Sequence, residues 1–364
     1  FDYSFQSWEN SGTLTNELRI YQKLEEQGFK FIFLTYGDES ELKYEKYFKS
    51  SIVVPIYSKL RFINSKLFRI LQSFLIPIYF YKLFKNVKLI KHNQLLGVWV
   101  AILLKIFLRV PLYVRTGYDM YTFSKLMKVG KLKVALYYFL TQFALASCNF
   151  YSVSSKTDLN SLRNKFIFTK KIKIRKNSLD TKDTKAFNKR KENEIVCVGR
   201  LEKQKNYEYL IKEFSDSKIK IDIYGEGSLR NELEKLAKKE NTKVEFKGLL
   251  DNDHLHSEMQ KYKYYIIPSH FEGNPKSLLE AMANGCAVFA SSIPNNKEIV
   301  DDKVTGYLFE LKTNELKNTF FNTKENEVLQ IASDGKEFIK KHYSIKKAVR
   351  KEVEDYKNLI DLRY

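Results

Sequence analysis

Residues 264–285 read YYIIPSHFEGNPKSLLEAMANG. The apolar start of this segment predicts a buried strand that ends at Pro268, and its second half has the apolar spacing of a helix. Asn274 is expected to be the N-cap of this helix, with Pro275 at its first position. Because the N–H groups of a first helical turn have no partner inside the helix, they form a site for an anion or a hydroxyl group.

Two glutamates lie near the expected start of the helix. Glu272 is in the loop before it and Glu280 is within it, with seven residues between them. An ionised carboxylate only accepts hydrogen bonds, so sugar and ribose hydroxyls are natural partners. The alternative is that Glu272 is a solvated loop acid and Glu280 a surface residue of the helix. Spacing alone favours this alternative, because most acidic side chains are exposed.

Eight positions of the segment match a longer pattern, E-G-x-P-x-x-x-x-E-A-M-A-x-G, from Glu272 to Gly285. The segment thereby resembles the donor-binding segment of the retaining glycosyltransferases of family 4, within glycosyl transferases group 1, which have the GT-B fold. The resemblance implies two Rossmann-like, doubly wound domains that face each other across a cleft. It also implies that the second domain binds a nucleotide-sugar.

A second motif lies earlier in the chain. Residues 198–201, Val-Gly-Arg-Leu, are followed by Lys205, and this string resembles V-G-R-L-x-x-x-K of the same family. Transfer from a nucleotide-sugar releases a diphosphate, so the protein must place positive charge beside the leaving group. Arg makes forked contacts with phosphate oxygens, and Lys adds a mobile point charge. Without the resemblance, two basic residues in a basic protein would indicate only an ordinary surface.

The resemblance implies roles for individual residues. Arg200, Lys205 and Glu272 would carry the reaction, with Glu272 on the donor sugar and Glu280 on the ribose. The other expected donor-binding residues lie around the helix start or at glycine-containing loops: Gly12, Gly225, Gly227, Leu249, Gly273, Asn274, Pro275, Lys276 and Ser277. A glycine after a strand is also an ordinary turn residue. Asn274 and Lys276 replace residues that are often apolar or small in the family, which leaves the identity of the donor open.

Four residues of the first half are candidates for binding the acceptor. Arg115, Tyr118 and Asp119 lie at or just after the end of an expected strand, residues 111–115, and His92 follows the strand before it. Ligands of open α/β sheets bind where strands end, and the matching loop of the resembling enzymes faces the acceptor. The alternative for His92 is a packed polar residue that binds nothing.

Alternating strand and helix patterns predict two α/β domains with parallel sheets. The expected limits are residues 1–176 for an N-terminal acceptor-binding domain, 177–191 for a linker and 192–342 for the donor-binding domain. A last helix, at about residues 343–364, is expected to pack back on the first domain, as in the resembling enzymes. Residues 177–181, Asn-Ser-Leu-Asp-Thr, resemble the N-x-x-D-T found at this junction in the family.

Several local features of the first domain are also predicted. Residues 1–5 are expected to end a strand, and residues 87–91 to form another. Residues 65–84 have helical spacing that Pro77 should break. Residues 95–108 predict a buried helix and not a membrane span, because the chain has no uninterrupted apolar run of about 20 residues.

The chain of 364 residues carries a net charge of +20, and the excess is concentrated in one region. Residues 46–157 contain 18 Lys and Arg but a single acid, Asp119, which gives a local charge of +17. Basic sequence with interspersed aromatics attracts anionic phosphate surfaces. Bulky apolar runs such as residues 74–81 favour an anionic membrane face over nucleic acid. The alternative is a lysine-rich surface without such a partner.

Other chemistries have little support. The chain lacks a GxxxxGK[ST] loop, a GxSxG elbow and a Cys or His cluster with zinc spacing. Its three cysteines are expected to be reduced core residues. The chain shows no signal-peptide pattern and does not begin with Met, so residues are expected to be missing before Phe1.

The resemblance implies a hexosyltransferase that needs no metal or cofactor. It would move a sugar from a UDP- or GDP-sugar to a saccharide or lipid-linked saccharide in the synthesis of a surface polysaccharide, capsule or lipopolysaccharide. We expect a cytoplasmic protein on the inner membrane face, with no nucleic acid as partner. Three alternatives stay open: an epimerase or phosphorylase on the same fold, a non-catalytic sugar- or membrane-binding relative, and a nucleic-acid-binding protein suggested by charge alone.

Overall fold

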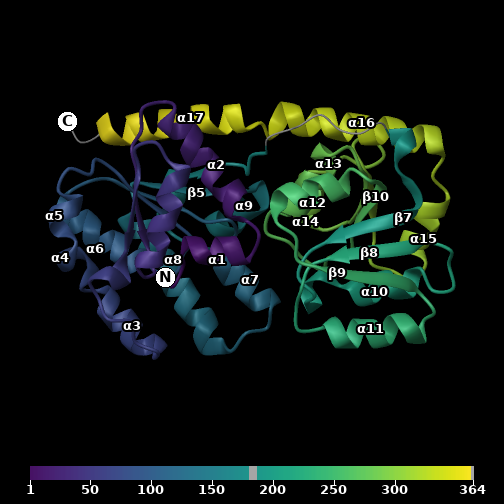
Figure 1. The fold of residues 1–364 in the computed structure, drawn as a ribbon, viewed down its shortest axis with the longest axis horizontal. Helices are drawn as coiled ribbons and strands as arrows, with labels where there is room; N and C mark the ends of the chain where they lie inside the picture. Colours follow the sequence, from purple (N-terminus) through teal and green to yellow (C-terminus); the bar gives the residue numbers. More distant parts are fainter. Residues whose placement is uncertain (180–186, 362–364) are drawn as a thin grey trace. The chain divides into compact units, whose positions relative to one another are not determined.

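The structure, a computed structural model, describes residues 1–179 and 187–361. The chain divides into two compact units, which Figure 1 shows as ribbons. Unit 1 comprises Phe1–Lys176 with Lys346–Tyr364, and unit 2 comprises Asn177–Ile345. All pairings between the named strands of the described residues are parallel, as expected where helices connect successive strands. The predicted α/β class with two Rossmann-like units is confirmed.

Unit 1 contains two parallel sheets, with strand orders β1-β2 and β3-β4-β5-β6. Its strands are β1 (Ile32–Thr35), β2 (Ile52–Pro55), β3 (Ile90–Asn93), β4 (Leu112–Arg115), β5 (Phe150–Val153) and β6 (Ile172–Ile174). The strand predicted at residues 87–91 was placed too early. β3 begins only at Ile90, which pairs with Leu112 of β4, whereas the N–H of Val87 donates to the carbonyl of Phe84 in a turn, at 3.0 Å.

The helices of unit 1 are α1 (Phe5–Asn10), α2 (Leu14–Glu25), α3 (Lys66–Ser73), α4 (Ile76–Tyr79), α5 (Tyr81–Phe84), α6 (Val98–Leu108), α7 (Met120–Leu126), α8 (Lys131–Ser147), α9 (Lys156–Lys165) and α17 (Ile345–Asp361). A strand at residues 1–5 was a wrong prediction. The hydroxyl of Ser4 caps α1 instead, because it accepts from the N–H of Ser7 at 3.2 Å. The helical region at residues 65–84 is broken before Ile76 and again at Phe80, but not at Pro77, which lies in the first turn of α4.

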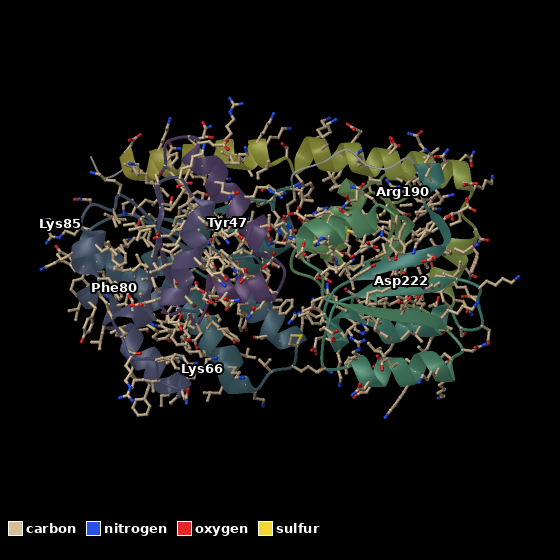
Figure 2. The ribbon with its side chains drawn as sticks, in the orientation of Figure 1. Tyr47, Lys66, Phe80, Lys85, Arg190 and Asp222 are labelled. Carbon is tan, nitrogen blue, oxygen red and sulfur yellow. The ribbon has the colours of Figure 1, made fainter. Side chains whose placement is uncertain are left out.

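The core of unit 1 includes Phe80 between α4 and α5, labelled in Figure 2, which packs with Ile76 and Phe84. Among the residues that the structure describes, no helix is both long enough and apolar enough to cross a bilayer.

Unit 2 is built on one parallel sheet with the order β12-β11-β10-β7-β8-β9. The strands are β7 (Lys191–Val198), β8 (Lys220–Tyr224), β9 (Lys243–Gly248), β10 (Tyr262–Ile267), β11 (Ala287–Ser291) and β12 (Tyr307–Phe309). The helices are α10 (Tyr207–Glu213), α11 (Arg230–Lys239), α12 (Asn252–Met259), α13 (Lys276–Ala283), α14 (Pro294–Lys297), α15 (Glu315–Phe321) and α16 (Glu325–His342). Figure 1 shows α12 and α13 on one side of the sheet and α10 and α11 on the other, which is the doubly wound arrangement.

The predicted linker, residues 177–191, is described only in part. Residues 180–186, which include the last two residues of the N-x-x-D-T match, lie outside the described residues. The chain then forms a short 3-10 turn at Phe187–Lys189 and enters β7 at Lys191. The sheet of unit 2 therefore begins one residue before the expected start of the second domain.

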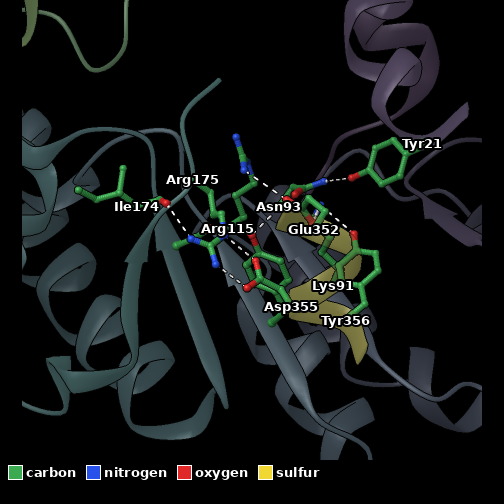
Figure 3. Close-up of polar contacts among 11 residues, drawn as sticks. Tyr21, Lys91, Asn93, Arg115, Ile174, Arg175, Glu352, Asp355 and Tyr356 are labelled. Carbon is green, nitrogen blue, oxygen red and sulfur yellow. Dashed lines mark hydrogen bonds and ion pairs between the residues drawn. The ribbon is translucent and has the colours of Figure 1, made fainter. Parts of the chain in front are cut away.

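Helix α17 packs on unit 1 through a buried charge cluster, shown in Figure 3. Glu352 is 1% exposed. Its carboxylate accepts hydrogen bonds from Lys91 Nζ at 2.9 Å and from the Tyr113 hydroxyl at 3.3 Å. Arg115 Nη1 lies 3.5 Å from the same carboxylate. Because a buried carboxylate needs compensating charge, these contacts determine where α17 can sit on unit 1.

A second ion pair lies one turn further along α17. Arg175 donates from both Nε and Nη2 to the carboxylate of Asp355, at 2.6 and 2.5 Å. Such a two-bond contact fixes the orientation of both side chains. The hydroxyl of Tyr356 in the same turn accepts from Lys91 Nζ at 3.0 Å. The helix is thus attached at neighbouring positions on one of its faces.

We predict that Glu352→Ala lowers the free energy of unfolding by about 3–5 kcal/mol, because it leaves Lys91 buried without its carboxylate. Glu354→Ala, at an exposed position of the same helix, should change it by less than about 0.5 kcal/mol. Urea unfolding measures both. Equal stability of the two variants would contradict a stabilising role for the cluster.

The same cluster makes unit 1 sensitive to acid. Burial alone would raise the pKa of Glu352, but the charges of Lys91 and Arg115 hold this pKa below its usual value of 4.5. A carboxyl with a lowered folded pKa stabilises the protein above its unfolded pKa and loses that contribution as the pH falls through the folded pKa. The stability difference between wild type and Glu352→Ala should therefore shrink below pH 4.5.

Candidate functional site

The candidate site lies where the strand order of unit 2 reverses. From β7 the chain proceeds to β8 and β9 on one side of the sheet, while β10, β11 and β12 lie on the other. β7 and β10 pair directly, with Ile195 opposite Tyr264. Loops that leave the carboxyl ends of two such strands diverge to opposite faces and leave a crevice for ligands. Here the loop after β7 carries Arg200 and Lys205, and the loop after β10 carries Glu272.

An ion pair joins the two loops. Lys205 Nζ lies 2.6 Å from Glu272 Oε1, and the two side chains are only 12% and 6% exposed. The hydroxyl of Ser269 donates to the same oxygen at 2.6 Å. Glu272 is therefore not a solvated loop acid, which was the alternative to a binding role. Its carboxylate is held in a fixed position by partners from both loops.

Gln204 also connects these two loops. It was not among the site residues predicted from the sequence. Its Nε2 donates to the carbonyl of Phe271 at 2.9 Å and lies 3.4 Å from Glu272 Oε2. Its Oε1 lies 3.4 Å from Arg200 Nη2. One buried amide thus contacts Arg200, the partner loop and Glu272. The only signal was its place at an unspecified position of the V-G-R-L-x-x-x-K match.

The start of α13 differs from the prediction by one residue. Asn274 was expected to be the N-cap, but Pro275 occupies that position and α13 begins at Lys276. Pro275 has an extended conformation, with φ −70° and ψ 91°, and its carbonyl accepts from the N–H groups of Leu278 and Leu279 at 3.1 and 3.2 Å. Asn274 Oδ1 instead accepts from Asn177 Nδ2 at 3.2 Å.

The other predicted residues of this segment are packed on the sheet. Glu280 is buried on α13, so the alternative of a surface residue is wrong. Ser277 Oγ accepts from the hydroxyl of Tyr265 on β10, at 2.8 Å. The carbonyl of Gly273 accepts a short hydrogen bond from Asn295 Nδ2 in α14. Asn295 was not predicted from the sequence, because it lies outside the two motifs on which the site prediction rested.

Glycines allow the loop after β8 to contact the backbone of the loop that carries Arg200. Gly225 has a positive φ of 149°, and a Cβ built on it would lie 2.0 Å from the carbonyl oxygen of Gly199. A Cβ on Gly227 would lie 2.4 Å from the carbonyl oxygen of Leu201. The backbones are thus in direct contact, which only glycine permits. Leu249, after β9, is exposed at the same edge of the sheet.

The predicted acceptor-binding residues of unit 1 each contact neighbours within that unit. Asp119 is buried and caps α7, because it accepts from the N–H groups of Tyr121 and Thr122 at 3.1 and 3.2 Å. Arg115 contacts Glu352 of α17. The ring of Tyr118, half-buried after β4, lies 4.5 Å from that of Phe123.

His92 and Gly12 are the two remaining predicted site residues of unit 1. Burial lowers the pKa of His92 to about 3, so its ring is neutral near pH 7. Its Nε2 lies 3.2 Å from the carbonyl oxygen of Leu96. Gly12 has a positive φ of 70° in the turn between α1 and α2, a conformation that glycine adopts without strain.

Residues 180–352 match the family model described as glycosyl transferases group 1. This match contains Arg200, Lys205, Glu272 and Glu280. A curated relative from Campylobacter jejuni is 32% identical over 43% of this chain and 46% of its own length. It is named N-acetylgalactosamine-N,N'-diacetylbacillosaminyl-diphospho-undecaprenol 4-alpha-N-acetylgalactosaminyltransferase. The chain spans less than half the length of the curated relatives that it first matches.

Solved structures of glycosyltransferases share the fold. A sucrose-phosphate synthase from Thermosynechococcus elongatus superposes with a TM-score of 0.77 at 17% identity, over 94% of this chain and 92% of that one. The Anabaena protein HepE, solved in complex with UDP-glucose, has a TM-score of 0.72 at 13% identity, over 94% and 95% of the two chains. The GT-B fold predicted from the sequence is thus confirmed.

We predict that Gly225→Ala destabilises the protein by about 1–3 kcal/mol and disturbs the Arg200 loop, because its Cβ would overlap the Gly199 carbonyl. Gly130→Ala is the matched control, since that glycine has a negative φ of −56° and its Cβ would meet nothing within 4 Å. Thermal unfolding compares the two. Equal melting temperatures would show that the two backbones are not in contact.

Proposed function

We propose that the protein is a retaining glycosyltransferase of family 4. It transfers a hexosyl group from a UDP- or GDP-sugar to a saccharide or lipid-linked saccharide acceptor, in the synthesis of a surface polysaccharide, capsule or lipopolysaccharide. The observation that carries this proposal is the partly buried ion pair of Lys205 and Glu272, with Arg200 beside it, at the reversal of strand order. This pair lies within the segment that matches the glycosyl transferases group 1 model.

The pair supplies the two kinds of contact that a nucleotide-sugar needs. In the reaction the bond from the sugar C1 to the diphosphate oxygen breaks, and negative charge accumulates on the diphosphate. Arg200 and Lys205 stabilise this charge, together with the first N–H groups of α13. Glu272 accepts hydrogen bonds from the sugar hydroxyls, and Glu280 accepts them from the ribose. Since Lys205 Nζ already lies 2.6 Å from Glu272, the contacts to diphosphate and sugar are adjacent.

Related proteins support this choice of substrates. The Anabaena structure holds UDP-glucose, and the name of the Campylobacter relative contains a diphospho-undecaprenol saccharide. We assign the acceptor to unit 1, where Arg115 and Tyr118 lie at and after the end of β4. Peripheral association with the cytoplasmic face of an anionic membrane is part of the proposal. The relatives do not favour an epimerase, a phosphorylase or a non-catalytic protein.

We propose that the reaction needs no metal or cofactor, because Arg200 and Lys205 supply the positive charge for the diphosphate. In the described parts of the chain, no three His, Cys, Asp or Glu residues lie together as metal ligands would. The assays below therefore contain EDTA. A requirement for an added divalent cation would contradict this part of the proposal.

We predict that Lys205→Ala lowers the rate of transfer on the order of 100- to 1000-fold, because one charged donor to the leaving group is lost. Lys203→Ala, an exposed lysine two positions earlier, should keep the wild-type rate. Release of the nucleoside diphosphate from a panel of UDP- and GDP-sugars measures both variants. Glu272→Gln should reduce the rate as well, because a neutral amide accepts hydrogen bonds from the sugar hydroxyls less strongly than a carboxylate does. Full activity of Lys205→Ala and Glu272→Gln would refute the site.

We predict that the product keeps the anomeric configuration of the donor. Retention would result from attack of the acceptor hydroxyl on the face from which the diphosphate leaves, with the hydroxyl proton passing to a leaving phosphate oxygen. Glu272 Oε1 already accepts bonds from Lys205 and Ser269, which suits an orienting group better than a nucleophile. NMR coupling constants of the product report its configuration. Inversion would contradict this route but not the donor site.

A further inference from the structure

Helix α8 exposes a continuous apolar face. Leu132, Leu136, Phe139 and Phe143 are 86%, 51%, 67% and 49% exposed. Their spacing of four, three and four residues places all four on one side of the helix. A soluble surface helix normally turns such a face toward its core. Here the core-facing residues, such as Ala144 and Leu145, are different ones.

The start of the same helix is strongly basic. Lys125, Lys128, Lys131 and Lys133 are all exposed in and around the connection from α7 to α8. The single acid of residues 46–157, Asp119, is buried as the cap of α7. It offers no charge at the surface to offset these lysines. The lysines thus place positive charge at the start of the apolar face, in a region of the sequence with no exposed acid.

A hollow of about 560 Å³ lies between α7 and α8 and continues this surface. Its lining is mainly apolar and aromatic, including Val134, Tyr138 and Phe139, while Lys125 and Lys131 also line it. Lys125 Nζ lies 4.3 Å from the ring centre of Tyr121. Ammonium groups beside apolar rings match the boundary between lipid headgroups and acyl chains.

Helix α3 adds a second amphipathic face to the same unit. Leu67, Phe68 and Leu71 are exposed on it, and it begins at Lys66, labelled in Figure 2. Its end is attached to α6, where Trp99 Nε1 donates to Ser73 Oγ at 2.8 Å. α6 in turn packs on α8. The two exposed faces are thus borne by helices joined through α6.

We infer that the exposed face of α8, with its basic start and the face of α3, docks on an anionic lipid bilayer. The lysines would contact lipid phosphates while Leu and Phe side chains enter the interface. Nucleic acid would use the lysines but not the apolar face. A second copy of the chain would bring like charges together. This inference specifies the membrane contact of the proposed function, but it can be tested without any transfer reaction.

Cosedimentation with vesicles tests the surface. The full chain should bind vesicles of phosphatidylcholine with phosphatidylglycerol, and bind pure phosphatidylcholine far less. Lys128→Glu/Lys131→Glu/Lys133→Glu should weaken binding at least about tenfold, since each lysine at an anionic surface contributes. The matched control reverses the charge of three exposed lysines of α11 in unit 2, Lys235→Glu/Lys238→Glu/Lys239→Glu. It should bind nearly as well as wild type.

A second pair of variants separates the apolar contribution from charge. Leu132→Ser/Phe139→Ser should weaken binding to anionic vesicles. It should also reduce the fraction of binding that remains at high salt concentration. Leu329→Ser/Phe321→Ser, at exposed positions of unit 2, should not. Circular dichroism establishes that all variants fold. Because these residues lie outside the donor site, donor turnover in detergent should be unchanged.

Four results would overturn the inference. Equal binding to neutral and anionic vesicles would remove the role of charge. Equal losses in the unit 2 controls would mean that the surface is not specific. Concentration-dependent dimers that Leu132→Ser/Phe139→Ser abolishes, without vesicle binding, would show that a second copy covers the face. If the wild-type protein turns over a donor but does not bind anionic vesicles, only this inference is refuted. If it binds the vesicles but turns over no donor, only the donor site is refuted.

Discussion

The parallel pairing of β7 with β10 is the constraint on which the candidate site depends. The strands are far apart in the sequence, and their register places Ile195 beside Tyr264. Their carboxyl ends therefore lie together, and the loops that follow bring Lys205 within 2.6 Å of Glu272, 67 residues later in the chain. Glu272 is held by Ser269 of its own loop and by Lys205 of the other loop, so its position depends on both loops together.

The residues around the two loops differ in whether the sequence could predict them. Arg200, Lys205 and Glu272 were predicted because the strings around them resemble two motifs of a known family, whereas their spacing alone favoured ordinary surface residues. Gln204 and Asn295 were not, since each acts by donating to a backbone carbonyl, of Phe271 and Gly273. Such a contact depends on where another strand ends, and no periodicity of the chain itself records it.

The same limit applies to the fold. Strand and helix existence followed from apolar periodicity, but boundaries depended on local hydrogen bonds that compete with it. Ser4 turns an apolar start into a helix by capping α1. Asn is a preferred N-cap residue, so Asn274 was predicted to cap α13. Pro275 is the N-cap instead, because its backbone is extended and the helix begins one residue later. Tertiary pairing likewise sets the start of β3 at Ile90.

The basic residues of unit 1 are divided between two environments, and this division gives the net charge a physical meaning. Lys91 and Arg175 are matched by buried carboxylates of α17, Glu352 and Asp355, so they contribute to the packing of a helix. The exposed lysines around the start of α8 lie in a region, residues 46–157, whose single acid, Asp119, is buried as a cap. Buried ion pairs lose little to salt, whereas exposed charge is screened within about 10 Å. Ionic strength should therefore act on surface association through α8 and leave the attachment of α17 intact.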